Sequence, residues 1–400
     1  MANIILFDNE VRMRLLPLTY TRPVCEIRVG ITTIREKWER AFGGQVSFIT
    51  EPYLSSKFPM QIGEDNWIIN GSVLPGEPLN GLIRNLDFGE ALMQGEELIA
   101  TRMNGEQINK LIEGNDIEAI EGRDISELKY LKINHLWEIC TLNEKALKED
   151  FQALTSNKIS QPIPEGVILY GSHQVFIDEG AVIEPCILHA VKGDLYFGKN
   201  TLVMAGSVIR GAFALCENSV VKAGAKIYES TTIGPHSKVG GEIKNSVFLG
   251  YSNKAHDGYL GDSVIGEWCN LGAGTNNSNM KNDYSEVKLW NYEWGKFEKT
   301  GHHFFGMIMG DHSKTAIGTS INTGSVIGVG VNIYEPGFPP NFIPSFSKGG
   351  KKKMETQPFK SFAKTCNLVY ERRGLMFDEK EQSILEAVFE ESAKYRRWEK

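Results

Sequence analysis

The chain has 400 residues, of which 41% are hydrophobic and 23% charged, and its formal charge is −7 at pH 7. This composition excludes a disordered chain, because it supplies enough apolar side chains for a core. The mild acidity and the lack of long apolar runs argue against nucleic-acid and membrane partners, and no signal peptide is recognisable, so we expect a cytoplasmic protein.

Residues 1–160 are predicted to form a small α/β domain. Strand-like apolar runs at 4–7, 46–49 and 67–69 alternate with helix-like stretches such as 31–41. This alternation is typical of a mainly parallel sheet covered by helices. Residues 142–158 indicate a linker helix, which closes the domain.

Residues 161–335 carry a repeat, and 25 of the 41 glycines fall in this segment. A period of six fits neither a helix nor a lone strand. It fits a parallel β-helix, in which each hexapeptide forms one flat face and its apolar residue points inward. Ile317 and Val329, twelve residues apart, are expected to continue the pattern near its end. Eight consecutive inward positions are predicted: Phe197, Val203, Ile209, Leu215, Val221, Ile227, Ile233 and Val239.

The segment 336–400 is predicted to end the β-helix and to add a helix. Residues 336–344 are rich in proline, which cannot extend a strand ladder. From Asp378 a helix is expected to pack on the β-helix or on a neighbouring subunit. The six cysteines are scattered without a CxxC pair, so we expect free buried thiols. The predicted apolar stripe of the helix consists of Ile384, Leu385, Val388, Phe389 and Tyr395.

Two interruptions of the repeat, at 244–259 and 276–303, are the predicted site region, because insertions in a β-helix emerge as outward loops that build binding faces. The stretch from Lys254 through His256 to Asp262 reads KAHDGYLGD, and 270–275 reads NLGAGT. Together with Asn279, these residues resemble the acetyltransferase domain of the GlmU family. That family joins an N-acetylglucosamine-1-phosphate uridyltransferase to a glucosamine-1-phosphate N-acetyltransferase.

The resemblance implies a left-handed parallel β-helix that transfers acetyl from acetyl-CoA to an amino-sugar 1-phosphate, in a homotrimer with its site between subunits. It also implies a part in UDP-N-acetylglucosamine biosynthesis and thus in making a cell wall precursor. His256 would act as the general base, since an imidazole titrates near neutral pH. Lys244 and Tyr259 would hold the sugar phosphate, and Asn270 and Asn279 would orient the sugar.

For the cosubstrate, the resemblance implies that the backbone amide near Ala273 stabilises the developing oxyanion and that the Thr319 hydroxyl contacts coenzyme A. The lysine run 351–353 is either a contact to coenzyme A phosphates or a solvated tail. The loop 281–300 is longer than in the family and either caps the site or packs between subunits. The family's phosphate-binding arginine is missing ahead of Lys244, and the candidate substitutes are Lys238, Arg210 and Lys226.

The N-terminal domain resembles sugar-nucleotide pyrophosphorylases in outline, through the frame LPLTYTRP at 16–23. The glycines that would hold a triphosphate are absent. Val24 stands at the expected lysine, and Ser72 replaces the carboxylate that would bind Mg²⁺. If this domain transfers a nucleotide from UTP with Mg²⁺, other cations must bind the phosphates. The candidates are Arg12, Arg14, Arg22 and Arg28, and the metal ligands stay unassigned.

Three interpretations therefore remain open at the level of sequence. The first is a GlmU-like transferase that acetylates an amino-sugar phosphate, with or without a working nucleotidyltransferase domain. The second is a sugar-1-phosphate nucleotidyltransferase whose β-helix is only structural. The third is a scaffold that binds sugar nucleotides without catalysis.

Overall fold

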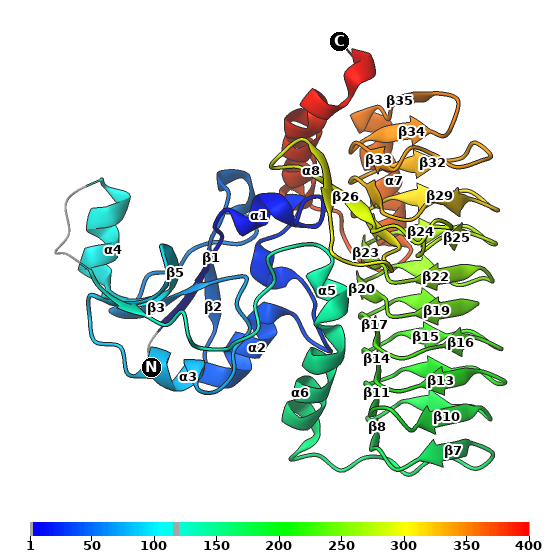
Figure 1. The fold of residues 1–400 in the computed structure, drawn as a ribbon, viewed down its shortest axis with the longest axis horizontal. Coiled ribbons are helices and arrows are strands. Elements are labelled where there is room, and N and C mark those ends of the chain that lie inside the picture. The colour runs from blue at the N-terminus through cyan, green and yellow to red at the C-terminus, as the bar shows by residue number, and fades with distance from the viewer. Residues whose placement is uncertain (1–2, 115–119, 400) are drawn as a thin grey trace. The chain divides into compact units, whose positions relative to one another are not determined.

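The structure is a computed structural model that describes residues 3–114 and 120–399 (Figure 1). The chain divides into two compact units. The N-terminal unit comprises Met1–Leu15, Thr21–Ile27 and Thr32–His135. The β-helix unit comprises Leu16–Tyr20, Arg28–Ile31 and Leu136–Lys400, and so includes the linker helix. Among the described residues, no helix is both long and apolar enough to cross a membrane.

The N-terminal unit is built on one mixed sheet of six strands in the order β2-β1-β3-β5-β4-β6. Strand β1 is parallel to β2 and β3, but β5 is antiparallel to both β3 and β4, so the sheet is less uniformly parallel than predicted. The strands are β1 (Asn3–Phe7), β2 (Val46–Ile49), β3 (Asp65–Asn70), β4 (Glu90–Gln94), β5 (Glu97–Asn104) and β6 (Glu121–Asp124).

Helices cover this sheet, and their ends follow local sequence signals. The predicted helix 31–41 is α2 (Ile34–Phe42), which begins with a reciprocal capping box between Thr33 and Glu36 and ends at Gly43 with φ of 72°. Both features satisfy terminal backbone groups that the helix leaves unpaired. The remaining helices of this unit are α1 (Val11–Arg14), α3 (Leu79–Arg84), α4 (Gly105–Ile112) and the short turns η2 (Val24–Glu26) and η3 (Pro52–Leu54).

The β-helix unit stacks its short strands into three long sheets, called here the first, second and third faces. All pairings within the faces are parallel except that of β34 with β35. The first face holds β7 (Ile168–Gly171), β10 (Ile187–Ala190), β13 (Val208–Arg210), β16 (Lys226–Ile227), β19 (Glu242–Lys244) and β22 (Tyr259–Gly261).

The second face is the one on which the linker helix packs. Its strands are β8 (Val175–Ile177), β11 (Leu195–Phe197), β14 (Phe213–Leu215), β17 (Thr231–Ile233), β20 (Val247–Gly250), β23 (Val264–Glu267), β28 (Met307–Met309), β31 (Ser325–Ile327) and β33 (Phe342–Ile343).

The third face completes each coil. Its strands are β9 (Val182–Ile183), β12 (Leu202–Val203), β15 (Val220–Val221), β18 (Lys238–Val239), β21 (Asn253–Lys254), β24 (Asn270–Leu271), β29 (Lys314–Thr315), β32 (Asn332–Ile333), β34 (Ser347–Gly349) and β35 (Met354–Thr356). The insertion 276–303 adds β25 (Asn276–Asn277), which pairs with β30 (Ser320–Ile321), and a hairpin of β26 (Lys288–Asn291) and β27 (Lys296–Lys299).

The predicted period of six is confirmed. All eight predicted inward residues, from Phe197 to Val239, belong to one buried apolar cluster with at most 1% of their surface exposed. The prediction for Ile317 was wrong, because its side chain is 83% exposed. Leu271 pairs with Thr315, 44 residues later, and 44 is not a multiple of six, so the insertion moves the inward register. Val329 is buried but lies outside that cluster, and the inward positions there are Ile321, Ile327 and Ile333.

The linker region forms α5 (Glu138–Thr141) and α6 (Asn143–Thr155), and α6 packs on the second face. Leu147 and Phe151 of α6 share a buried cluster with Phe176 and Tyr196. The Asn143 side chain donates to the carbonyl of Ser230 at 2.9 Å, which anchors the start of the helix.

After the β-helix come α7 (Phe359–Glu371) and α8 (Glu379–Glu391), followed by the turns η4 (Ser392–Tyr395) and η5 (Arg397–Glu399). Helix α8 begins at the position that the sequence indicated, and Asp378 caps it by accepting from the Glu381 amide at 2.9 Å. Phe389 packs against Phe346 and Phe359 of the same chain. The predicted helix therefore covers the end of its own β-helix. All six cysteines are free and buried.

Candidate active site

A polar network on the β-helix joins two of the predicted site residues. Asn279 donates to the hydroxyl oxygen of Tyr259 at 2.9 Å and to a carboxylate oxygen of Asp262 at 2.5 Å. Asn245 donates to the other Asp262 oxygen at 2.7 Å. Asp262 is therefore held from both sides. The sequence analysis named Asp262 only as part of the motif and did not single out Asn245. The position of Asn245 directly after Lys244 could have marked it as a site residue.

Tyr259 is prepared to donate a hydrogen bond. Burial and the nearby Asp262 and Glu242 carboxylates raise the pKa of Tyr259 to about 12, so its phenol is protonated at neutral pH. The phenol oxygen already accepts from Asn279. Its own proton is thus directed to another acceptor, as a phosphate contact requires.

Lys244 lies on the same outer face as Tyr259. Strands β19 and β22 are adjacent, with Glu242 opposite Tyr259 and Lys244 opposite Gly261, and residues two apart in a strand point the same way. The Lys244 side chain is exposed, with its ammonium 6.0 Å from the centre of the Phe304 ring. A cation and a phenol donor therefore share the end of the first face.

The three candidate substitutes for the missing arginine are placed differently. Lys226 belongs to β16 of the first face, beside Glu242. Arg210 donates to Glu229 at 2.9 Å, and Lys238 lies in β18 of the third face. Of the three, Lys226 is the cation on the face of Tyr259 without an ion pair among the described residues.

His256 stands in a corner loop, 255–258, between β21 and β22. The imidazole is exposed, and the loop is tied to the next coil: the Gly274 amide donates to the Asp257 carbonyl at 2.9 Å. Gly258 has a φ of 123°, and a Cβ there would lie 2.2 Å from the Thr275 carbonyl oxygen. Only glycine allows this close approach, so the backbone fixes the loop of His256 beside the corner that contains Ala273.

Beneath this loop lies a buried lysine that the sequence prediction did not place. Lys254 occupies an inward position opposite Val239, with 1% of its surface exposed. Its ammonium donates to the carbonyls of His256 at 2.8 Å and Gly240 at 3.1 Å. Burial lowers the pKa of Lys254 to about 8. The signal was available, because Lys254 precedes the inward Leu260 by six residues.

The two residues expected to contact acetyl-CoA differ in whether their hydrogen-bond donors are free to bind a ligand. The amides of Gly272 and Gly274 donate within the chain, whereas the Ala273 amide has no hydrogen bond to any residue within 3–114 or 120–399. Thr319 is 4% exposed, and its hydroxyl donates to the Ala316 carbonyl at 2.8 Å. The Ala273 amide is thus free for a ligand oxygen, while the Thr319 hydroxyl is engaged by its own corner.

Asn270 does not join the network around Tyr259. It begins β24 of the third face, with its side chain exposed, whereas Tyr259 begins β22 of the first face. One chain therefore presents the predicted residues on two faces that meet at the corner of His256.

The N-terminal unit has a cavity of about 520 Å³ where β1 ends. Ligands of open α/β sheets bind outside the carboxyl ends of strands. Glu97 is central here: its carboxylate accepts from Asn9 at 2.7 Å and Asn70 at 3.0 Å, and it pairs with the Lys132 ammonium. None of these residues was predicted. The lining comprises Phe7, Asn9, Glu10, Val11, Arg14, Glu96, Glu97, Leu98, Lys132 and Asn134.

The four predicted arginines do not gather at this cavity. Arg14 lines it, but Arg12, Arg22 and Arg28 are at most 7% exposed. Arg12 lies 3.4 Å from the Glu51 carboxylate and donates to the Tyr53 hydroxyl at 2.5 Å. Arg28 belongs to the β-helix unit, where it donates to the carbonyls of Leu249 at 3.1 Å and Ile31.

The residues around Ser72 do not fit a Mg²⁺ site. The Ser72 hydroxyl donates to Asn70 at 2.7 Å, and the nearby Glu97 carboxylate is paired with Lys132. Over the described part of the chain, no group of three His, Cys, Asp or Glu side chains could hold a metal ion. Mg²⁺ in nucleotide sites is usually held by one or two carboxylates beside waters and phosphates, and the carboxylate near Ser72 is already paired, so no chemistry is assigned to this ion here.

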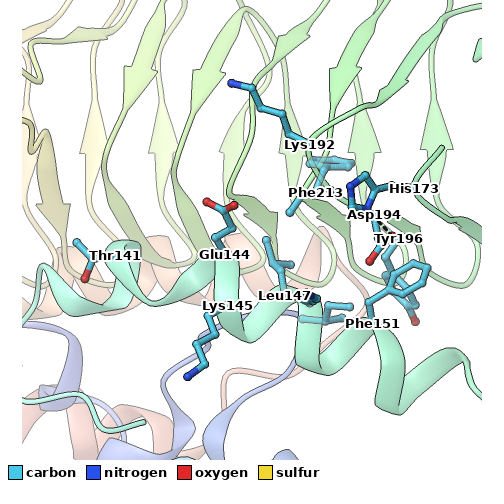
Figure 2. A pocket seen from close by; sticks show the side chains of 14 residues that line it. Thr141, Glu144, Lys145, Leu147, Phe151, His173, Lys192, Asp194, Tyr196 and Phe213 are labelled. Carbon is cyan, nitrogen blue, oxygen red and sulfur yellow. Dashed lines mark ion pairs between the residues drawn. The ribbon is translucent and has the colours of Figure 1, made fainter. Parts of the chain in front are cut away.

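A further cavity of about 480 Å³ lies between α6 and the second face (Figure 2). Leu147 and Phe151 of α6 form one wall, and Tyr196 contributes to the other. Figure 2 shows an ion pair at its edge, between His173 and Asp194 at 3.4 Å. None of the predicted site residues lines this cavity.

Known proteins are similar to parts of this chain. Residues 4–159 match the sugar nucleotidyl transferase family. The bifunctional protein GlmU of Cyanothece sp. is 26% identical over 223 residues, covering 50% of this chain and 48% of that protein. The bifunctional sugar-1-phosphate nucleotidylyltransferase/acetyltransferase of Sulfurisphaera tokodaii is 31% identical over 146 residues, covering 36% of each chain. The chain thus spans about half or less of the curated relatives that it matches.

Among solved structures, the polySia specific acetyltransferase NeuO matches 48% of this chain and 88% of its own, at 14% identity and a TM-score of 0.24, a similarity too low to support an argument. The fold and the family match together describe a segment similar to sugar nucleotidyl transferases, followed by a hexapeptide β-helix. More specifically, the chain is similar to several proteins named bifunctional protein GlmU, at 26–27% identity.

Proposed function

We propose that the β-helix unit transfers an acetyl group from acetyl-CoA to the amine of an amino-sugar 1-phosphate, with glucosamine-1-phosphate as the substrate. The observation that carries this proposal is the network of Tyr259, Asn279 and Asp262 beside Lys244. It offers a cation and a protonated phenol to a phosphate, and amide and carboxylate groups to sugar hydroxyls.

His256 takes a proton from the substrate ammonium, since a neutral imidazole can accept one near pH 7. The amine nitrogen then attacks the thioester carbonyl carbon. The Ala273 amide, which has no other acceptor among the described residues, donates to the oxygen that becomes negative. As the C–N bond forms, the attacking nitrogen releases its second proton to solvent. As the C–S bond breaks, coenzyme A leaves as the thiolate and takes up the proton held by His256, so the products are the amide, free coenzyme A and one released proton.

The placement of Asn270 supports a homotrimer with the site between copies. Tyr259 and Lys244 stand on the first face, Asn270 stands on the third face, and the loop of His256 lies at the corner between them. A second copy whose third face approached the first face of this chain would supply the missing amide. Contacts of this kind join two different faces of the same chain, so they repeat from copy to copy and close into a ring, which in a homotrimer contains three copies.

For the N-terminal unit we propose nucleotidyl transfer, with UTP as the first donor to test. Two observations support this proposal: the family match, and the cavity at the carboxyl end of β1, which is lined by the positively charged side chains of Arg14 and Lys132. Lys132 can stabilise phosphate charge as a lysine does in other phosphoryl-transfer sites. No metal is placed at this cavity.

The test supplies the full chain with glucosamine-1-phosphate, acetyl-CoA and UTP, and measures free coenzyme A and pyrophosphate separately. We expect coenzyme A release by the parent protein and a loss of about 10²–10⁴-fold in His256→Ala. His173→Ala is the matched control, because His173 is an exposed histidine of the same unit outside the network. Equal rates in the parent protein and His256→Ala would remove the assigned base. Coenzyme A release without pyrophosphate would restrict the function to acetyl transfer.

A further inference from the structure

The insertion hairpin and the C-terminal turn of the β-helix unit border an open cavity of about 770 Å³ that no part of the proposed reaction uses. One side is β26 and β27, and the other is residues 340–344 with η4 and η5. Its volume lies within the usual range for sites that bind small molecules. The lining comprises Lys281, Lys288, Trp290, Phe297, Thr323, Pro340, Asn341, Phe342, Pro344, Tyr395, Arg397 and Trp398.

The walls of this cavity are aromatic and firmly packed. The Trp290 ring stacks on Phe342, with centres 4.1 Å apart and planes 12° apart, and Phe297 meets its edge at 5.4 Å. Trp398 is held by a hydrogen bond from its indole nitrogen to the Thr356 hydroxyl at 2.9 Å, yet 38% of the residue is exposed. Such rigid aromatic surfaces favour a planar ring, which gains stacking without ordering the wall.

The charges at the cavity all have one sign. Lys281, Lys288 and Arg397 line it, and the lining contains no carboxylate. The Lys281 ammonium donates to the Glu286 carbonyl at 2.9 Å. Lys288 and Arg397 make no ion pair with any other residue in the described ranges. An anionic ligand would therefore meet two uncompensated cations, and arginine suits the geometry of a phosphate group.

The aromatic wall also contains an unsatisfied donor. Trp290 is 8% exposed, and its indole N–H has no hydrogen-bond acceptor among the described residues. A buried donor without an acceptor is costly. A ligand with ring carbonyl or nitrogen acceptors would relieve this cost after a small shift of the wall.

We propose that this cavity binds a nucleoside phosphate, with the base against Trp398 and the wall of Trp290, and the phosphates at Lys288 and Arg397. Two sources share this chemistry: a free uridine nucleotide, or the adenosine phosphate part of coenzyme A. The proposal rests on the cavity alone and does not require the acetyl transfer proposed above.

The cavity is coupled through the backbone to the polar network. Lys281 follows Asn279 by two residues, and the Thr323 hydroxyl donates to that of Ser278 at 2.8 Å. Residues 278–281 therefore contact the cavity at one end and the network at the other. The cavity and the polar network therefore share this short segment.

The experiment titrates the full chain with UDP, with ADP and with coenzyme A, following heat and tryptophan fluorescence. We expect one of these probes to bind with a Kd below about 1 mM and to bind more weakly as salt increases. The double variant Lys288→Ala/Arg397→Ala is expected to weaken binding at least about tenfold, because each cation contributes a charge-assisted contact. Trp398→Ala should weaken it by about three- to tenfold.

The matched control is Trp294→Ala/Lys296→Ala, which removes a tryptophan and a cation from the same hairpin but outside the cavity. It should leave binding unchanged. Binding of UDP alone would identify a free uridine nucleotide, and binding of ADP and coenzyme A would identify the coenzyme. Failure of all three probes with the folded parent protein would overturn the proposal. Equal binding by the cavity variants and the control variant would also overturn it. If the cavity variants changed the oligomeric state and left ligand binding unchanged, the cavity would instead be a contact with a second copy of the chain.

Discussion

The two units of the chain use their charged side chains in opposite ways. In the N-terminal unit, Arg12 and Arg22 are at most 5% exposed, and Glu97 is surrounded by donors. In the β-helix unit, Lys244 and His256 stand outward on a regular surface. Lys254 differs from these two, because it points inward and is 1% exposed. In a regular repeat, the position of a residue in the coil determines whether its side chain points outward or inward. In an irregular α/β unit, that direction depends on tertiary packing, which no local sequence pattern describes.

This comparison is tested most strongly at the inward positions of the β-helix. Phe248 is fully buried and lies between Ile233 and Ile265 of adjacent coils. Phe248→Ala is expected to lower the free energy of unfolding by about 3–5 kcal/mol, because it removes apolar contacts and leaves a cavity. Urea unfolding measures this. Ile317→Ala is the control, and at an 83% exposed position it should change stability by less than about 0.5 kcal/mol. Similar losses in both variants would contradict the shifted register.

Lys254 provides the second test, through pH. Its folded pKa of about 8 lies below its unfolded value, so the unfolded chain binds more protons between the two values. Stability should therefore increase with pH in this window, by about 2 kcal/mol between pH 7.5 and 9.5. Urea unfolding of the parent protein and of Lys254→Met at both pH values isolates this contribution. A pH dependence that persists in Lys254→Met would assign it to another group.

Glu97 tests whether the two units work independently. Glu97→Gln removes the negative charge that holds Lys132 and is expected to reduce pyrophosphate release by about tenfold, or about 1.4 kcal/mol. Coenzyme A release should be unchanged. Thermal unfolding of the variant separates a local effect from loss of the fold. An equal reduction in both reactions would show that the units are functionally coupled.

The smallest expected effect concerns Asn279. Asn279→Ala removes its hydrogen bonds to Tyr259 and Asp262, so the KM for the amino-sugar phosphate should increase by about three- to tenfold. The effect on kcat should be smaller, since Asn279 orients the substrate and transfers no proton. Asn276→Ala is the control three residues earlier in the chain: its side-chain oxygen accepts from the Tyr259 backbone amide, and it makes no bond to the Tyr259 hydroxyl or to Asp262. A change in kcat alone would contradict the assigned role.

Much of the β-helix could be predicted because its repeat relates sequence position directly to side-chain direction. Phe197 through Val239 occupy the predicted inward positions, and Asp378 caps the predicted helix. The contact between Tyr259 and Asn279 could not be predicted from the repeat alone. The two residues are twenty positions apart in the sequence, and they meet only because the chain completes a coil between them. The arginines of the N-terminal part illustrate the limit: four cations within 17 residues suggested one site, and the fold distributes them.

The sequence alone therefore determined the division into an α/β part and a β-helix, the inward column and the segments that carry the polar site, because these depend on period and composition. Only the tertiary structure decided the register after the insertion, the burial of Lys254, the grouping around Glu97, and the cavity between the hairpin and the C-terminal turn. Each of these depends on contacts between residues distant in sequence, whose energies come from burial and from paired charges that a local pattern does not encode.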